Sequence, residues 1–202
     1  MLLKKFPMFS LAVLFAMTAQ PVFADDDEKD EKKQPCPVAS PYVDGFGNTV
    51  SYDEKFGPGT TAIMSCIKER EDIKLVMQVN NFVDGKGRPY GFRNLPKMLD
   101  DYLITHGVDE DEIDIRVVIH GGGHPFVLDP DAPNAHPLAS KNTFKGMVMG
   151  LMARGVKVQF CLNTAAALNV KTHQIIPGVE YVTAGLTSIA DYQERGYNYI
   201  QP

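Results

Sequence analysis

The sequence predicts an α/β fold, a single domain with a mostly parallel sheet and helices on both of its faces. From residue 73 onward, apolar β-branched segments alternate with segments whose apolar residues recur at helical spacing. Such alternation is typical of parallel sheets, because each crossover between parallel strands carries a helix. The 202 residues, 44% hydrophobic and 22% charged, exclude a wholly disordered chain and suffice for one globular domain.

Each element of this domain has its own signal. The strands are β-branched runs that stop at glycine or polar residues, and we expect them at residues 73–79, 113–120, 156–161 and 178–183, with a small one at 197–200. The helices are amphipathic segments that end at a glycine. We expect them from a cap at Asn94 to Gly107, from near Ser140 to Gly155, after a cap at Asn163, and from Ser188 to Gly196.

The N-terminal region divides into two parts before this domain. Residues 1–24 are typical of a secretory signal peptide, with Lys4 and Lys5 before an apolar run and cleavage expected after Ala24. Residues 25–72 form a charged linker and a turn-rich extension, and residues 73–202 form the α/β domain. We therefore expect an exported, periplasmic protein. An uncleaved signal anchor is the alternative, although the run is short for a membrane span.

The charge balance excludes whole classes of partner. The signal peptide carries two lysines and no acidic residue, so its removal takes the net charge from −5 to −7. An acidic protein has no electrostatic footprint for nucleic acid or for an anionic lipid surface. We expect neither nucleic-acid binding nor membrane association after signal cleavage.

The three cysteines indicate one bridge and one remaining thiol in an oxidising compartment. Cys36 and Cys66 flank the turn-rich part of the extension, and we expect a disulfide between them. Two unpaired thiols are one alternative. In another, one of the two resolves Cys161.

Three features fall where strands end, which is the sheet edge at which α/β proteins form their sites. They are the Asp84–Arg88 loop, the His120–His124 loop and Cys161. A thiol at the start of a helix faces unpaired backbone N–H groups, which favour the nucleophilic thiolate. We therefore place Cys161 and His120 as catalytic candidates. The alternative is a buried structural cysteine. The candidate substrate-binding residues at the same edge are Asn80, Gly121, Gly122 and Asn163.

The His120–His124 loop, of sequence HGGGH, permits other chemistries. An esterase would need a G-x-S-x-G nucleophile elbow, which the sequence lacks. Metal binding by His120, His124 and His136 is open, but the spacing is only permissive, and we expect no metal and no cofactor. The segment 121–139 is long for a strand-to-helix connection, which predicts a lid or an oligomer contact.

Residues 73–202 resemble the DsrE/DsrF-like family of small sulfur-relay proteins. Short motifs in a fixed order carry the resemblance: His120-Gly121, the run GVKVQFCLNT at 155–164 and the ending ADYQERGYNYIQP at 190–202. The resemblance implies a sheet of about five strands, assembly into homotrimers or hexamers, and a persulfide on the cysteine after the third strand. Cys161 stands at that position.

We therefore expect an exported sulfur carrier or transferase that uses Cys161, with His120 favouring the thiolate or moving a proton. Its partners would be copies of itself, with the 197–200 tail and the 121–139 segment as contacts, and a sulfur donor or acceptor protein. The alternative is a non-catalytic periplasmic protein that binds a small ligand, a metal or a partner protein.

Overall fold

The computed structural model describes residues 42–43, 48–63 and 71–202. The expected signal peptide and the expected Cys36–Cys66 bridge lie outside these residues. Among the residues that the structure describes, no helix is long and apolar enough to cross a membrane.

The described part of the extension contains short elements of its own. Strands β1 (Tyr42–Val43) and β2 (Thr49–Val50) pair antiparallel, and helices α1 (Tyr52–Phe56) and α2 (Thr60–Ile63) follow. Ser51 caps α1 through a reciprocal pair of hydrogen bonds with Glu54. Asp53 then ties the two helices together by accepting hydrogen bonds from Thr61.

The domain is built around one five-stranded sheet in which every neighbouring pair is parallel, in the order β6-β5-β4-β3-β7. This confirms the predicted α/β class. The strands are β3 (Ile73–Val79), β4 (Ile113–Ile119), β5 (Lys157–Cys161), β6 (Glu180–Val182) and β7 (Asn198–Ile200).

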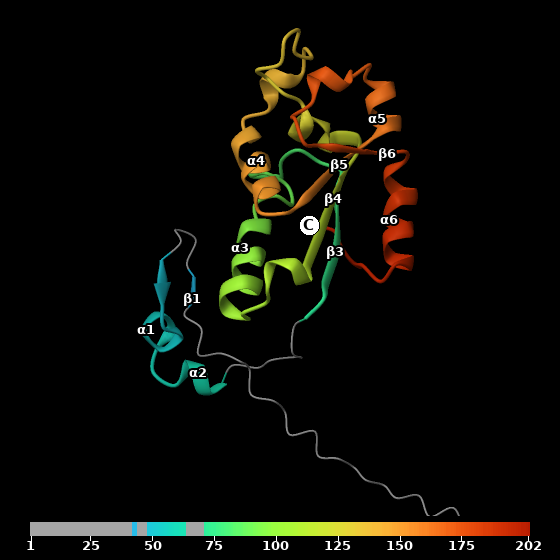
Figure 1. The fold of residues 1–202 in the computed structure, drawn as a ribbon. Coiled ribbons are helices and arrows are strands. Elements are labelled where there is room, and N and C mark those ends of the chain that lie inside the picture. The colour runs from blue at the N-terminus through green and yellow to red at the C-terminus, as the bar shows by residue number, and fades with distance from the viewer. Residues whose placement is uncertain (1–41, 44–47, 64–70) are drawn as a thin grey trace, which may run out of the picture. The chain divides into compact units, whose positions relative to one another are not determined.

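The helices cover both faces, with α3 and α4 on one side of the strands and α6 on the other (Figure 1). The α-helices are α3 (Leu95–Asp100), α4 (Lys145–Ala153), α5 (Leu162–Ala167) and α6 (Gly185–Glu194). A π-helical segment η1 (Asp101–Thr105) extends α3, and the 3-10 segments are η2 (Glu110–Glu112), η3 (Gly121–Val127), η4 (Ala139–Lys141) and η5 (Thr172–Gln174).

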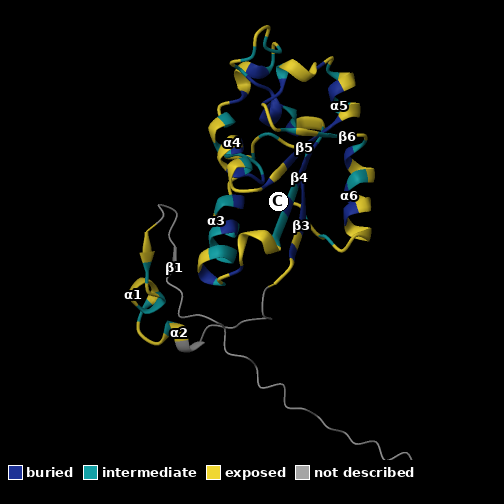
Figure 2. Cartoon of the chain, in the orientation of Figure 1, coloured by how far each residue is buried: buried dark blue, intermediate teal, exposed yellow. Residues whose placement is uncertain are grey.

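The principal apolar core lies on the α3 and α4 side of the sheet, and the central strands are buried from both sides (Figure 2). It includes Val117 and Phe160 from the strands, Leu95 from α3 and Val148 from α4, together with Phe126 from η3. Because side chains alternate along a strand, the same strands turn their other residues toward α6.

The segment 121–139 differs from the predicted lid. Its first part forms η3, and Phe126, Val127 and Leu128 are buried in the core. The Ile176 N–H donates to the Val127 carbonyl and the Asp129 N–H donates to the Gln174 carbonyl, which fastens the segment to the chain beyond α5. The prediction of a lid or an oligomer contact rests on the length of this connection, and the glycines and prolines hide the short apolar run between them.

Two helices begin at positions other than the predicted ones. The helix expected from Ser140 starts at Lys145, because the buried Asn142 side chain donates to the Phe126 and Leu128 carbonyls and holds the preceding chain in a turn. The last helix starts at Gly185 instead of Ser188. Asn94 does stand at the N-cap of α3, but its side chain makes no capping hydrogen bond.

Candidate functional site

The thiol of Cys161 lies at the junction between β5 and α5. Cys161 is the last residue of β5 and also the N-cap of α5, so the helix begins two residues earlier than a cap at Asn163 predicts. Its side chain is 4% exposed in the single chain, which is less than the partial exposure expected of a reactive thiol. The Gly185 N–H, at the start of α6, donates to its Sγ at 3.2 Å.

The surroundings of this sulfur favour the thiolate. Burial raises the pKa of the Cys161 thiol, but backbone N–H groups of Thr164, Gly185 and Asn163 and the Thr164 hydroxyl outweigh burial and bring the pKa below its usual value. Two helix starts, those of α5 and α6, therefore supply donors to one sulfur atom. Because a thiolate is the nucleophilic form, the arrangement suits sulfur chemistry.

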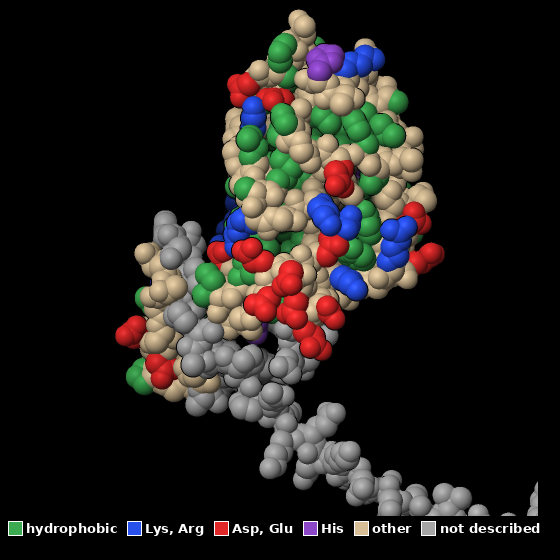
Figure 3. Space-filling view, in the orientation of Figure 1, with side chains coloured by type: hydrophobic (Ala, Val, Ile, Leu, Met, Phe, Trp, Pro, Cys, Tyr) green, Lys and Arg blue, Asp and Glu red, His purple; other side chains and the backbone are tan. Residues whose placement is uncertain are grey.

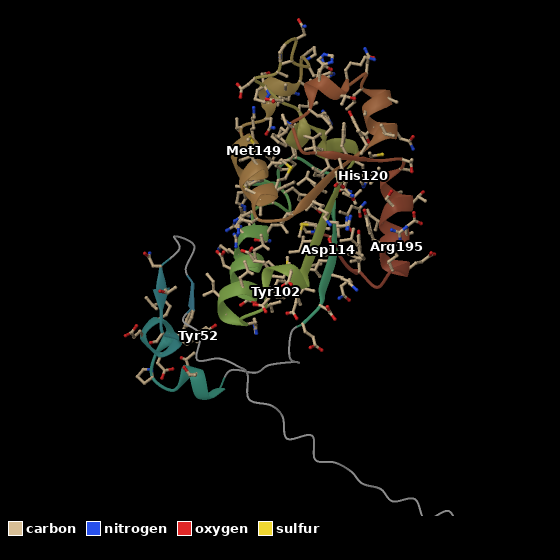
Figure 4. The ribbon with its side chains drawn as sticks, viewed as in Figure 1. Tyr52, Tyr102, Asp114, His120, Met149 and Arg195 are labelled. Atoms are coloured by element: carbon tan, nitrogen blue, oxygen red, sulfur yellow. The ribbon has the colours of Figure 1, made fainter. Side chains whose placement is uncertain are left out.

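His120 lies beside Cys161 across the sheet. Ile119 of β4 pairs in register with Phe160 of β5, so the next residues along the two strands, His120 and Cys161, are neighbours. His120 lies on the α6 side of the strands, as does Asp114 farther down β4, whereas Met149 lies on the opposite side, on α4 (Figure 4). Burial lowers the pKa of the His120 imidazole, so the ring is neutral near pH 7 and an imidazolium is not what stabilises the thiolate.

Gly185 has no side chain because the His120 ring occupies that space. A Cβ on Gly185 would lie 3.1 Å from three carbon atoms of His120, a tighter contact than side chains normally make. The same residue thus packs against His120 and donates its N–H to Cys161. Together with Thr164, it completes a site that the sequence alone did not reveal, since no motif marks a glycine that follows a strand.

The predicted substrate-binding residues are brought together in part. Gly121, Gly122 and Asn163 line an open hollow of about 420 Å³ beside the start of α5, together with His124, Thr164, Ala167 and Leu168. The Gly121 N–H is engaged, because it donates to the Thr164 hydroxyl at 3.0 Å. Asn80 is not among the lining residues, although a Cβ on Gly122 would lie 2.8 Å from its carbonyl oxygen. The hollow thus borders the Cys161 site through Asn163 and Thr164.

The HGGGH segment is a packed turn, in which His124 Nε2 is buried without a hydrogen-bond partner. A Cβ on Gly123 would lie 2.4 Å from the Val79 carbonyl oxygen, so only glycine fits there. His124 Nδ1 hydrogen-bonds the Gly121 carbonyl at 2.9 Å, and burial lowers the pKa of this imidazole. The neutral histidine therefore closes the turn.

The three histidines do not converge. His120 Nε2 faces the Gln78 side chain, and His136 Nε2 donates to the Leu168 carbonyl at 3.0 Å. Within the described ranges, no three His, Cys, Asp or Glu side chains gather closely enough to hold a metal ion.

The Asp84–Arg88 loop is held by hydrogen bonds between its own residues. The Asp84 carboxylate accepts hydrogen bonds from the backbone N–H groups of Lys86 and Arg88 and from the Arg88 guanidinium. These contacts, led by the guanidinium, lower the pKa of Asp84 to about 2. The loop is therefore a closed turn, in which the charges of Asp84 and Arg88 are paired.

Charged side chains cluster at the amino-terminal ends of the strands, opposite the end of the sheet at which Cys161 lies. On the face seen in Figure 3, acidic side chains cluster near the start of β4, next to Lys and Arg side chains. Asp114 of β4 forms an ion pair with Arg116 at 2.9 Å. Because Cys161 ends its strand at the opposite edge, local N–H groups are its main electrostatic influence.

Comparison with known proteins assigns the family. The model of the DsrE/DsrF-like family matches residues 75–202. The chain belongs to the DsrE/DsrF-like family. This confirms the resemblance seen in the sequence, and the family is one associated with sulfur relay. No curated protein sequence matches the chain significantly.

Two solved structures resemble this DsrE-like domain. A protein of unknown function from Methanobacterium thermoautotrophicum, MTH1491, is 21% identical, with a TM-score of 0.50; the match covers 64% of this chain and 99% of that one. The YchN protein of E. coli is 19% identical, with a TM-score of 0.44, over 64% of this chain and 100% of that one. The likeness to MTH1491 supports the fold.

Proposed function

We propose that this DsrE-like protein is an exported sulfur carrier or transferase in which Cys161 bears a persulfide. The observation that carries the proposal is the set of N–H donors around Cys161 Sγ, which brings the pKa of the thiol below its usual value despite burial. A cysteine with only a packing role has no need of donors from two helix starts. Membership in a family associated with sulfur relay supports the same chemistry.

The transfer is a pair of thiolate displacements. The Cys161 thiolate attacks the outer sulfur of a donor persulfide, R–S–SH, so that a new S–S bond forms, the donor S–S bond breaks, and R–S⁻ leaves. An acceptor thiolate then attacks the outer sulfur of Cys161–S–SH, and the Cys161 thiolate leaves. No external oxidant is needed, because the sulfane sulfur carries its oxidation state with it. A lowered pKa makes Cys161 a better leaving group in the second step.

The donor and acceptor would approach through the hollow lined by Asn163 and Thr164, and would reach Cys161 when the start of α5 or α6 moves. We infer a periplasmic location from the N-terminal leader, and assembly of the chain into homotrimers or hexamers from the family. The exposed strand β7 and the exposed part of the 121–139 segment are the proposed contacts.

The burial of Cys161 favours a second candidate function. A side chain that is 4% exposed cannot meet a donor unless the start of α5 or α6 moves. If it does not move, the protein is a non-catalytic periplasmic protein that binds a small ligand, a metal or a partner protein. Reactivity of Cys161 in the folded protein separates the two functions.

The test is sulfur uptake by the folded chain. The Cys36→Ser/Cys66→Ser variant, in which Cys161 is the remaining cysteine, is incubated with inorganic polysulfide and weighed by intact-mass spectrometry. We expect a mass gain of whole sulfur atoms that a reductant removes. The matched control is Cys161→Ser with Cys36 and Cys66 retained, in which this reductant-labile gain at Cys161 is absent.

Comparing sulfur uptake by the folded and the denatured protein shows whether the folded structure makes Cys161 reactive. The same cysteine in denaturant has an ordinary pKa, so the folded chain should take up sulfur at neutral pH at least as fast. If the folded chain gains no sulfur while the denatured chain does, the persulfide function is wrong and the binding function is preferred.

A further inference from the structure

We propose that Gln78, held in place by Tyr199, is a positioning residue that fixes the His120 imidazole as the neutral tautomer with its proton on Nδ1; its role in catalysis rests on the proposed function. Gln78 is the second-last residue of β3 and is 7% exposed. Its Nε2 lies 2.7 Å from His120 Nε2. The Tyr199 hydroxyl, from β7, donates to the Oε1 of the same amide.

The direction of these contacts settles the tautomer. An amide nitrogen carries only hydrogens, so Gln78 Nε2 donates and His120 Nε2 must accept. A neutral imidazole that accepts at Nε2 carries its proton on Nδ1. The Tyr199 O–H donates to the amide oxygen, with Gln201 Oε1 a second acceptor at 3.3 Å, and this contact supports the orientation in which the amide nitrogen faces the ring. The hydrogen-bond chain therefore runs in one direction, from Tyr199 through Gln78 to His120.

The ring is also held mechanically. Gly185 packs against the Cβ, Cγ and Cδ2 atoms of His120, and the His120 N–H donates to the Val79 carbonyl at 3.1 Å. With Nε2 engaged by Gln78 and the Cδ2 edge against Gly185, Nδ1–H is the donor that the ring has left. We assign to this N–H the task of donating to sulfur as the thiolate forms or leaves.

The same face of the sheet holds a second buried glutamine that serves as a comparison. Gln159 of β5 accepts from the Tyr192 hydroxyl at 2.9 Å and donates to Glu180 at 2.8 Å. Both glutamines are thus oriented by a tyrosine hydroxyl, but only Gln78 contacts a histidine. Tyr192→Phe therefore makes the same chemical change as Tyr199→Phe without touching the His120 chain.

The test reads the tautomer directly, by the ¹⁵N chemical shifts of the His120 ring in the full chain at neutral pH. Native protein should carry the proton on Nδ1. Gln78→Glu replaces the donor with a carboxylate that can only accept, so we expect the proton to move to Nε2. Tyr199→Phe frees the amide to turn and should give a mixture of tautomers. Tyr192→Phe should leave the native spectrum of His120 unchanged.

A proton on Nε2 in the native protein would overturn the proposal, as would a tautomer that Gln78→Glu and Tyr199→Phe leave unchanged. Circular dichroism and comparison with the Tyr192→Phe control identify a variant that has merely lost its fold. If Gln78→Glu does not fold, Tyr199→Phe, which removes a single oxygen atom, still tests the proposal. These readouts need no sulfur donor.

The sulfur-uptake assay then connects the tautomer to function. Because positioned proton transfer contributes roughly 10²–10⁴-fold to rate, Tyr199→Phe should slow uptake about tenfold and Tyr192→Phe should not. Absence of uptake in native protein with the expected tautomer would defeat the proposed function and leave the positioning intact. Normal sulfur uptake by the native protein, together with a His120 tautomer that Gln78→Glu and Tyr199→Phe leave unchanged, would support the proposed function and defeat the positioning role of Gln78.

Discussion

The two faces of the sheet share five strands but differ in composition. The face under α3 and α4 is apolar and joins strand residues to four phenylalanines, Phe82, Phe92, Phe126 and Phe144. The face under α6 has an apolar cluster with only four buried members, Val76, Val118, Ile189 and Tyr192. Around it lie glutamines, an Asp–Arg pair, His120 and Cys161. The first face supplies stability and the second supplies the chemistry of the site.

The largest effect is expected for Phe126→Ala on the apolar face. Phe126 is fully buried, with ring centroids 4.4 Å from Phe92 and 4.7 Å from Phe82. Its loss should cost about 3–5 kcal/mol of the free energy of unfolding, measured by denaturant titration. Ile189→Val, on the α6 face, should cost about 0.5–1.5 kcal/mol. Equal costs would contradict the division of labour between the faces.

Gly123→Ala should have the next largest effect. Its Cβ would collide with the Val79 carbonyl oxygen, and such overpacking costs about 1–3 kcal/mol or more. Gly146 lies inside α4 with open space around it. Gly146→Ala should therefore stabilise the protein by about 0.5–1 kcal/mol. Thermal unfolding that ranks the two variants the other way would show that η3 is not packed on the sheet as described.

Tyr197→Phe tests the polar network on the α6 face. The Tyr197 hydroxyl donates to Asp114 at 2.7 Å and accepts from Arg116 at 3.0 Å. Hydrogen bonds to charged groups contribute about 1.5–3 kcal/mol, and this network is only partly buried, so a loss of about 1 kcal/mol is expected. Unchanged stability in denaturant titration would mean that solvent replaces these contacts.

The same network predicts a pH dependence. Burial raises the pKa of Asp114, but hydrogen bonds from Tyr197 and Arg116 outweigh it and keep that pKa below its usual value. The folded state thus favours the carboxylate. Its contribution to stability is complete above the unfolded pKa of about 4 and is lost as pH falls through the folded pKa. The stability difference between native protein and Asp114→Asn should shrink as pH falls below about 4; a constant difference would contradict this.

The smallest effect is expected at the site itself. Thr164→Val removes one hydroxyl that lowers the pKa of Cys161, so that pKa should rise and alkylation at neutral pH should slow modestly. Thr172→Val, at an exposed position in η5, is the matched control. A rate that both variants leave unchanged would remove Thr164 from the site.

The sequence predicted the strands well because their apolar runs are unambiguous. It placed Cys161 at the end of β5 and His120 at the end of β4 for the same reason. It did not predict Gln78 or Tyr199 as partners, because a polar residue that alternates along a strand is typical of a solvent-exposed face. Which residues meet across that face depends on strand order and on the position of α6, and no local pattern encodes either.

The sequence did not predict that the first part of the 121–139 segment packs into the core. Glycines and prolines usually indicate a surface loop, yet here Gly123 is small so that the chain can approach Val79, and the neighbouring Phe126 enters the core. A contact between backbone segments that are distant in the sequence leaves no recognisable pattern in the local sequence of either segment. The same holds for Gly185, whose role depends on His120 from a distant strand.

N–H donors from the starts of α5 and α6 lower the pKa of the Cys161 thiol despite its burial, and this lowering is what makes Cys161 a candidate nucleophile. The most direct measurement is the pH dependence of alkylation of Cys161 in the folded Cys36→Ser/Cys66→Ser chain, mapped by mass spectrometry. We expect a midpoint below about 8.5, the value of a free thiol. A midpoint at or above that value, or alkylation that requires unfolding, would contradict it.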